Sequence, residues 1–366
     1  MVERKIQLPE GVIPLNMYYF YLTDGCNLAC QHCWITPTYQ PNGDTGGHLD
    51  YDLFVLAIEE GLPLGLSGVK LTGGEPLLHP DFVRMVDFVR EKELGLIIET
   101  NGTLMTQSLA RYLKEKSTLN HISISLDGAT AGTHDPFRGV KGSFEKAVQG
   151  VRYLVEAGIH PQIIMSIHAG NADEIEALVQ LAENSGAGSV KFNLIQSSGR
   201  GEVLAKRGRT LDVQRLIELG KWVEGDLQKR TSISLHYSWP IAFFGLKHLL
   251  KNNTLEVCGI YNILGVLASG QLALCGIGVG VPELVYGQLG KDRVSEVWVN
   301  SPLLNKLRSD IKEHPDGICA RCLLYHRCLG SCVAENYHLH KRIPAPFWFC
   351  QDAEAVGLFP QTRLST

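Results

Sequence analysis

The chain has 366 residues, of which 45% are apolar and 20% charged, and its formal net charge is −4 at pH 7. This balance excludes a disordered chain and gives no basic field that would favour nucleic acid. No apolar run approaches the about 18 residues of a membrane span, and the start MVERKIQLPE lacks the apolar core of a signal peptide. We therefore expect a cytoplasmic protein with one large domain and an appendage.

Short apolar runs alternate with amphipathic stretches through the first part of the chain. The apolar runs are 17–22, 68–74, 94–100, 121–128, 160–168 and 189–195, and the helical patterns that follow them are 51–62, 80–92, 106–116, 143–157, 172–185 and 211–228. Near-continuous apolar strands with intervening helices indicate a parallel sheet covered on both faces. Polar segments such as TGGEP and TNGT follow the strands. In a barrel, the loops at the carboxyl ends of the strands converge on one mouth, where the chemistry takes place. Six repeats rather than eight predict a partial (β/α)₆ TIM-like barrel that is open at one side.

The ten cysteines are distributed unevenly along the chain. Three fall between residues 26 and 33, none between 34 and 257, and seven between 258 and 350. Because the cytosol keeps thiols reduced, metal ligands are a better explanation than disulfides. We expect a barrel domain over residues 1–230, a bridging segment over 231–257 and a loop-rich domain over 258–366, in which metal sites replace a hydrophobic core.

The stretch CNLACQHC places Cys26, Cys30 and Cys33 close together. Thiolates at these spacings can surround one side of a 4Fe–4S cluster, and three ligands leave the fourth iron open to a cofactor or substrate. A zinc site that borrows His32 or Asp24 as its fourth ligand is the alternative that these residues leave open.

This stretch resembles the CxxxCxxC signature of the radical S-adenosylmethionine (SAM) enzymes, and TGGEP, TNGT, SLDG and HDPFRG resemble later elements of that superfamily in the same order. The resemblance covers residues 15–200 and implies that the Gly73–Gly74 backbone meets the methionyl amino group of SAM. It also implies that Arg138 pairs with the methionyl carboxylate and that His32 lies near the adenine. The further SAM contacts expected from it are Glu75, Pro76, Thr100, Asn101, Ser125, Asp127 and Leu194.

The cysteines of the tail resemble the seven-cysteine SPASM extension of radical SAM enzymes that mature peptides and proteins. The resemblance implies two auxiliary iron–sulfur clusters, both expected to be of the 4Fe–4S type. A distal cluster would be held by Cys319, Cys322, Cys328 and Cys350. A proximal cluster would be held by Cys258, Cys275 and Cys332, with one iron that lacks a cysteine. A zinc ribbon is the alternative that the spacing alone leaves open.

The resemblance further implies reductive cleavage of SAM to a 5′-deoxyadenosyl radical that abstracts hydrogen from a peptide, with a cross-link as the first product to expect. The reductant would be a flavodoxin- or ferredoxin-type protein. Only 25 residues precede Cys26, so leader recognition is expected to need a separate protein or another surface. The candidate residues on the substrate side are Asn193, Gln196, Ser198, Arg200, His236 and Tyr237.

Three other functions remain open at this point. An anaerobic sulfatase maturase, which forms formylglycine, would have an eighth cysteine and an acidic residue where this chain has Gly276. A radical SAM dehydrogenase or mutase that acts on a small molecule is a second. The third, from a different class, is a binding protein stapled by zinc, which metal content would distinguish.

Overall fold

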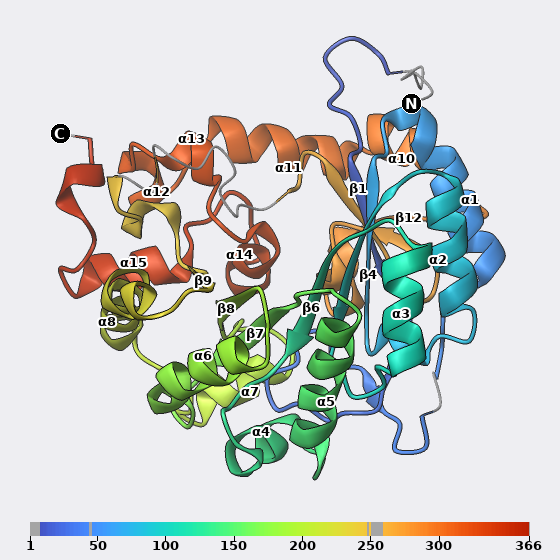
Figure 1. The fold of residues 1–366 in the computed structure, drawn as a ribbon. Helices are drawn as coiled ribbons and strands as arrows, with labels where there is room; N and C mark the ends of the chain where they lie inside the picture. Colours follow the sequence, from blue (N-terminus) through green and yellow to red (C-terminus); the bar gives the residue numbers. More distant parts are fainter. Residues whose placement is uncertain (1–7, 44–45, 247–248, 250–258, 366) are drawn as a thin grey trace.

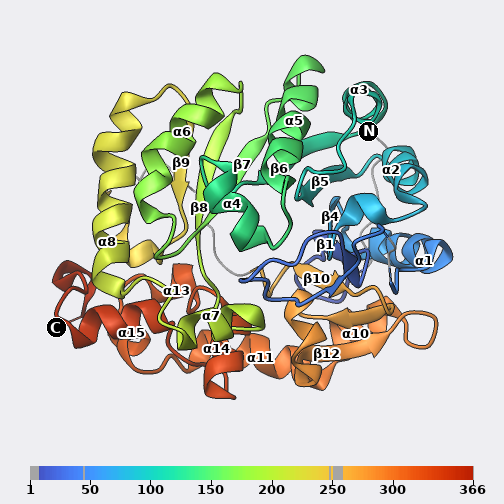
Figure 2. The ribbon, with the colours of Figure 1, turned by 90° about the horizontal axis from the view of Figure 1, so that it is seen from below.

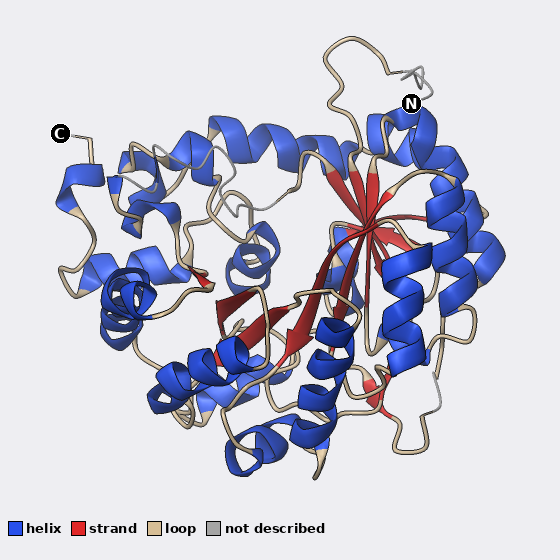
Figure 3. Cartoon of the chain, viewed as in Figure 1, coloured by secondary structure: helices blue, strands red, loops and turns tan. Residues whose placement is uncertain are grey.

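A computed structural model of the chain describes residues 8–43, 46–246, 249 and 259–365. Within these residues, ten strands form one sheet in the order β12-β11-β10-β1-β4-β5-β6-β7-β8-β9. The strands of the barrel are β1 (Met17–Tyr21), β4 (Gly68–Thr72), β5 (Gly95–Thr100), β6 (Leu119–Ser125), β7 (Gln162–Ile167) and β8 (Ser189–Leu194). They pair in parallel along the sheet (Figure 3), so all the predicted strands are confirmed.

Helices cover the outer face of this curved sheet, as Figure 2 shows. They are α1 (Tyr51–Gly61), α2 (Phe82–Glu91), α3 (Gln107–Lys116), α5 (Ser143–Glu156), α6 (Ile175–Asn184) and α8 (Val213–Trp222). In α2, the buried side chains Phe82, Met85, Val86 and Val89 follow the helical period and form one apolar stripe. The last predicted helix was too long as a single α-helix, because a π-helical turn follows Trp222. The partial barrel is confirmed.

Alternation along the strands separates the core from the interior of the barrel. In β4, Val69 and Leu71 are fully buried among the core residues, whereas Lys70 and Thr72 line a cavity. Successive side chains of a strand point to opposite faces of the sheet. The interior of this barrel is therefore a polar cavity, and the core lies between the sheet and its helices.

Further strands extend the sheet on both sides of the predicted barrel. β9 (Ser234–Tyr237) pairs in parallel with β8, and β10 (Ile263–Val266) pairs in parallel with β1. β11 (Gln271–Ala273) and β12 (Val285–Gln288) add an antiparallel edge beyond β10. The sequence pattern did not predict these short strands, and they place residues from both ends of the chain in one sheet.

The C-terminal helices are α10 (Val294–Asn300), α11 (Pro302–Glu313), α12 (Ile318–Arg321), α13 (Tyr325–Cys328), α14 (Val333–His340) and α15 (Trp348–Ala355). Helix α10 packs on α1, whereas α15 lies beside α8 at the open side of the barrel (Figures 1 and 2). Trp298 is fully buried and donates a hydrogen bond from its indole Nε1 to the carbonyl of Ile13 at 2.9 Å. This contact joins the C-terminal part to the start of the barrel.

Four short elements lie at the carboxyl ends of the barrel strands. They are β2 (Gly25–Cys26), β3 (Thr38–Tyr39), α4 (Ala131–Arg138) and α7 (Arg200–Lys206). In the part of the chain described by the structure, no helix is both long enough and apolar enough to cross a bilayer.

Candidate active site

The loop after β1, residues 22–37, carries the three N-terminal cysteines and is called the cluster loop below. Hydrogen bonds from Ala29 N to Arg138 O and from Gln31 N to Phe137 O, both 2.9 Å, hold it against α4. On the other side, Arg200 N donates to the carbonyl of Cys33 at 3.0 Å. The loop is therefore fixed from two directions, and the thiols of Cys26, Cys30 and Cys33 all line one cavity.

The surroundings of these thiols suit a metal cluster. Burial raises the pKa of Cys26 and of Cys30, and neighbouring thiols of the same loop add to the effect. Arg138 opposes it at Cys30, where its Nη1 lies 3.6 Å from the sulfur. Buried thiols that must lose their protons need a positive partner, and metal ligation supplies one. The donor set therefore fits a 4Fe–4S cluster held by three cysteines.

The two glycines of TGGEP lie directly against the cluster loop. Gly73 has a φ of +130°, and a Cβ at Gly74 would come within 1.9 Å of the carbonyl oxygen of Gly25. A side chain at either position would push the end of β4 away from the loop. From the sequence, we expected these glycines to let a ligand approach the backbone closely. The structure shows that they also let the end of β4 approach the backbone of the cluster loop.

Glu75 ties the ends of two strands to the cluster loop. Its carboxylate accepts hydrogen bonds from Thr100 Oγ1 at 2.6 Å and from Asn101 N at 2.9 Å, and the residue is 1% exposed. Burial raises the pKa of Glu75, and these donors act against that rise. Asn101 continues the network through its side-chain amide, which donates to Asn27 Oδ1 at 2.8 Å.

Arg138 and Asp127 form a buried ion pair, with Nε and Oδ2 2.6 Å apart. Asp127 is fully buried, and its Oδ1 accepts a hydrogen bond from Ser166 N at 2.8 Å. Burial would raise the pKa of Asp127, but Arg138, two neighbouring histidines and the Ser166 hydrogen bond together outweigh burial and leave that pKa below its ordinary value. Arg138 lines the cavity and Asp127 lies behind it. The aspartate therefore orients the arginine rather than reaching a ligand.

His32 forms one end of a stack of three rings. Its ring lies 4.5 Å from that of Phe137 with an interplanar angle of 2°, and Phe137 stacks on His168 with the ring centroids 3.9 Å apart. Burial lowers the pKa of His32 to about 3, although Asp127 acts in the opposite direction, so the imidazole is neutral. Its buried Nδ1 has no hydrogen-bond partner among the described residues. A neutral ring with an unused nitrogen at the cavity wall suits a heteroaromatic ligand.

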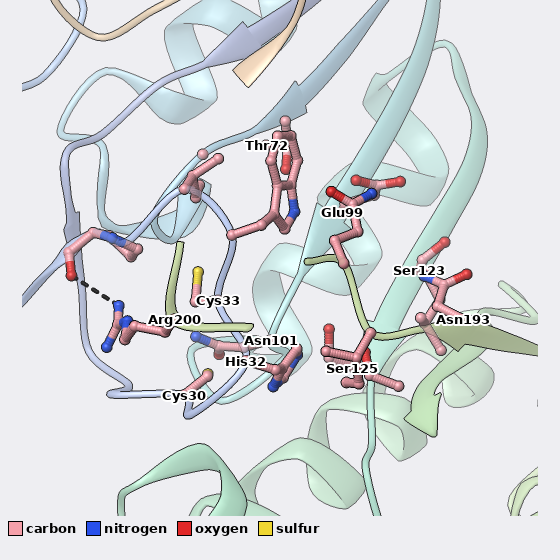
Figure 4. Close-up of a pocket in the computed structure, with 18 of the residues that line it drawn as sticks. Cys30, His32, Cys33, Thr72, Glu99, Asn101, Ser123, Ser125, Asn193 and Arg200 are labelled. Atoms are coloured by element: carbon pink, nitrogen blue, oxygen red, sulfur yellow. Dashed lines mark hydrogen bonds between the residues drawn. The ribbon is translucent and has the colours of Figure 1, made fainter. Parts of the chain in front are cut away.

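These groups surround one cavity of about 430 Å³. Figure 4 shows Cys30, Cys33 and Arg200 on one side of it, with Ser123 and Asn193 on the opposite side. The predicted SAM contacts that line it are His32, Gly73, Gly74, Glu75, Thr100, Asn101, Ser125, Arg138 and Leu194. Two predicted contacts, Pro76 and Asp127, do not line it.

The predicted substrate-side residues divide into two groups. Asn193, Gln196 and Arg200 line the cavity, whereas Ser198, His236 and Tyr237 do not. Tyr237 is buried and donates a hydrogen bond from its hydroxyl to the carbonyl of Leu216 in α8 at 2.8 Å, because alternation along β9 turns it toward the helix. The structure therefore does not bring His236 or Tyr237 to the cavity. Their neighbour Ser238, which the sequence reasoning missed, does line it.

Four cysteines of the C-terminal part come together in a second place. Cys319, Cys322, Cys328 and Cys350 line a pocket of about 20 Å³, called the distal cysteine pocket below. Its other walls are Pro240, Ile241, Ala242, Ile318, Tyr325 and Phe359. Burial raises the pKa of the Cys350 thiol, and the other three cysteines raise it further. The resemblance to the SPASM extension implied these four as ligands of one cluster, and the fold brings the same four together.

The remaining cysteines lie nearer the main cavity. Cys332 lines it, next to Ser331. Cys275 lies close enough to Tyr21, another lining residue, to raise the pKa of its hydroxyl, although burial is the larger cause. Cys258 lies outside the described residues.

Glu335 is a cavity residue that the sequence reasoning missed. It is 3% exposed, and one carboxylate oxygen accepts a hydrogen bond from Ser197 N at 2.8 Å. Burial raises its pKa to about 7 in spite of that donor. An isolated acid in α14 carries no sequence signal, because only the fold brings α14 to the loop after β8.

Among the described residues, no three Cys, His, Asp or Glu side chains are arranged to hold a single metal ion.

Comparison with known proteins agrees with this geometry. Residues 20–182 match the Radical SAM superfamily. The AdoMet-dependent heme synthase of Oleidesulfovibrio alaskensis is 27% identical over 90% of this chain and 85% of its own length. The mycofactocin maturase MftC of Mycobacterium tuberculosis is 29% identical over 86% of this chain and 78% of its own.

Among solved structures, SuiB of Streptococcus suis bound to the precursor peptide SuiA superposes with a TM-score of 0.72, at 19% identity, over 93% of this chain and 76% of that one. The match includes the C-terminal part as well as the barrel, so the predicted fold is confirmed across both. The motifs, the barrel and the matched family model together show a radical SAM domain over residues 20–182 of this chain.

Proposed function

We propose that this enzyme cleaves SAM reductively and uses the product to oxidise or cross-link a peptide. The observation that carries the proposal is the convergence of three thiols, a glycine turn and a buried arginine on one cavity. SAM bound to a 4Fe–4S cluster supplies a 5′-deoxyadenosyl radical able to remove hydrogen from an unactivated carbon, and the protein's part is binding, orientation and exclusion of water.

The residues divide this work by their chemistry. Cys26, Cys30 and Cys33 would hold the cluster. Arg138 presents a guanidinium that Asp127 keeps charged and oriented, which suits the carboxylate of a methionyl group. The Gly73–Gly74 turn allows close approach of the backbone, and neutral His32 offers a flat surface for an adenine.

The C-terminal part would hold the auxiliary clusters, and we propose that residues 258–366 form this unit beside a barrel of residues 1–230. The distal cysteine pocket offers four thiols and apolar walls, which suits a cluster closed to substrate. Cys332 faces the main cavity, where a proximal cluster held with Cys258 and Cys275 could take up the electron left on a product radical. All nine cysteines in the described residues are free thiols, which suits a cytoplasmic enzyme.

Two similarities support a peptide as the substrate. SuiB was solved with a precursor peptide, and MftC is a maturase by name. A cross-link is the first product to look for, with a separate leader-binding protein and a flavodoxin- or ferredoxin-type reductant as partners.

The sulfatase-maturase alternative meets a structural obstacle at residue 276. A Cβ at Gly276 would lie 2.3 Å from the ring of Tyr21, so an acidic side chain there requires the tyrosine to move. This position therefore does not offer the acid that formylglycine formation would use in that family.

A second candidate is a heme-forming reaction on a tetrapyrrole. It is favoured by the heme synthase relatives, whose alignments cover 86–91% of this chain, and by the lysines on the cavity wall, which suit propionate groups. Product analysis with each substrate class separates the two candidates.

The test of the proposal is metal content and SAM cleavage under anaerobic conditions. Reconstituted enzyme should contain about twelve irons with matching sulfide, and a Cys26/Cys30/Cys33→Ala variant should contain about four fewer. With dithionite, 5′-deoxyadenosine should appear with the parent and not with the variant. Zinc in place of iron, together with no deoxyadenosine from the parent, would contradict the proposal.

A further inference from the structure

We propose that the inner wall of the barrel binds a carboxylate of the substrate, and that Lys191 and Lys70 recognise it. The identity of the carboxylate as a substrate group rests on the function proposed above. The site itself is argued from the charges and exposure of the barrel wall.

Two ammonium groups act electrostatically on one carboxylate in this wall, and one of them is paired with it. Lys70 of β4 and Glu99 of β5 form an ion pair with Nζ and Oε1 3.0 Å apart. Burial would raise the pKa of Glu99, but Lys70 and, more weakly, Lys191 of β8 and His121 of β6 outweigh burial and lower it. The ordinary charges of Lys70, Glu99 and Lys191 sum to +1 on this wall.

These groups border the cavity, and the Lys70 ammonium also lies 4.0 Å from the ring centroid of Tyr19. Lys70, Glu99 and Lys191 all line the main cavity. The Lys70 side chain is 15% exposed and that of Glu99 is 38% exposed, so water within the cavity reaches both. A barrel that needs only to be stable fills its interior with branched apolar residues. Charges that line a void instead are arranged for a ligand.

The neighbouring side chains offer hydrogen bonds without adding negative charge. Ser123, Ser125 and Ser166 come from β6 and β7, and Ser238 donates from its hydroxyl to Asn193 Oδ1 at 3.1 Å. These short hydroxyls and amides can orient a second oxygen of a bound carboxylate.

The other acids of the cavity oppose an anion only weakly. Glu75 is occupied by the donors of Thr100 and Asn101. Glu335 is partly protonated near neutral pH, because burial raises its pKa to about 7. Across the cavity from Asn193 lies Arg200, a further cation at the wall (Figure 4). The cavity as a whole therefore attracts negative charge.

Either substrate class considered above can supply the carboxylate, as the C-terminus or an acidic side chain of a peptide, or as a propionate of a tetrapyrrole. Two probe pairs distinguish these sources. One is an N-acetylated tripeptide acid with its C-terminal amide, and the other is iron coproporphyrin III with its tetramethyl ester. Calorimetry for the peptides and absorbance titration for the porphyrins would measure binding to anaerobic holoenzyme with SAM and no reductant.

We expect at least one acid to bind the parent enzyme about 10-fold or more tightly than its neutral counterpart, since hydrogen bonds to charged groups contribute that much. Lys191→Gln should reduce the preference to within about 3-fold, and Lys191→Arg should retain it. Lys146→Gln is the matched control, because Lys146 is exposed on the outer helix α5. It should change neither the binding nor the SAM cleavage.

Equal binding of acid and neutral probe by the parent overturns the inference without any variant. An acid preference that survives in Lys191→Gln also overturns it. Deoxyadenosine release by the parent under dithionite reports separately on the proposed function. A parent that cleaves SAM but shows no acid preference contradicts the carboxylate site alone.

Discussion

The cluster loop opens onto a cavity of about 430 Å³, whereas the distal cysteine pocket encloses only about 20 Å³. Hydrogen bonds and an ion pair surround the first, through Glu75, Asn101 and Arg138. Proline, isoleucine and aromatic side chains surround the second.

The difference shows that thiols can be used in two ways within one chain. An open polar site leaves room for a ligand beside the metal and supplies charges to orient it. A closed apolar site keeps water and ligands away from the metal and makes the local packing depend on it. Changes in the first region should therefore affect chemistry, and changes in the second should affect folding.

Replacing either group of cysteines with alanine should have the largest effect on iron content and thermal stability. The Cys319/Cys322/Cys328/Cys350→Ala variant should lose about four irons, as the cluster-loop variant does. It should also lower the melting temperature further, because its small pocket has no core to replace the metal. Iron assay and anaerobic differential scanning calorimetry on both variants check this. If both variants lowered the melting temperature equally, the two regions would not differ in their contribution to folding.

Asp127→Asn should destabilise the barrel by about 3–5 kcal/mol, because it leaves the buried Arg138 guanidinium without its counter-charge. Urea unfolding of the apoprotein measures this loss. Asp50→Asn serves as a control, since Asp50 is an exposed N-cap of α1 and asparagine caps helices equally well. A change of less than about 1 kcal/mol at Asp127 would mean that the pair is not buried as described.

The buried acid Glu335 should make stability depend on pH where α14 contacts the loop after β8. Its pKa is about 7 in the folded protein, above the ordinary 4.5, so the folded state binds this proton more tightly. The stabilisation of the folded state by this proton is complete below pH 4.5 and is lost as the pH rises through 7. Between pH 5 and pH 8 the parent should lose about 2–3 kcal/mol relative to Glu335→Gln. Parallel pH profiles for the two proteins would contradict this.

Thr100→Val should have the smallest effect, a loss of about 1.5–3 kcal/mol, because it removes a neutral donor to the buried Glu75 carboxylate. The pKa of Glu75 should rise further without this donor. Thr100→Ser keeps the hydroxyl and should recover most of the loss. Chemical denaturation of the three proteins provides the comparison, and equal stability of the valine and serine variants would argue against the hydrogen bond.

The strands of the barrel and most of its helices could be predicted because their apolar residues repeat with a clear period. The short strands β9 to β12 could not, since runs of three or four residues carry too little periodicity. The helix α4 was missed because Pro136 and a glycine interrupt its pattern. Yet α4 carries Arg138 and holds the cluster loop.

The gathering of the cysteines could be anticipated because their spacing resembles a known pattern, and their role as cluster ligands stays a prediction. The charges of the cavity could not be anticipated, because Lys70, Glu99 and Lys191 each stand alone in an apolar strand. Only the register of three separate strands brings them into one wall. The pairing of Asp127 with Arg138 likewise depends on how α4 folds back over β6, which no local pattern specifies.

The place of β1 in the middle of the sheet has a consequence for synthesis. One edge of β1 pairs with β4 soon after translation begins, but its other edge must wait until Ile263–Val266 have left the ribosome. Until then the nascent barrel exposes an unpaired strand edge, the kind of surface that invites aggregation. Loss of the C-terminal residues would therefore harm the barrel even before any metal is inserted, and solubility during expression should depend on the full length of the sheet.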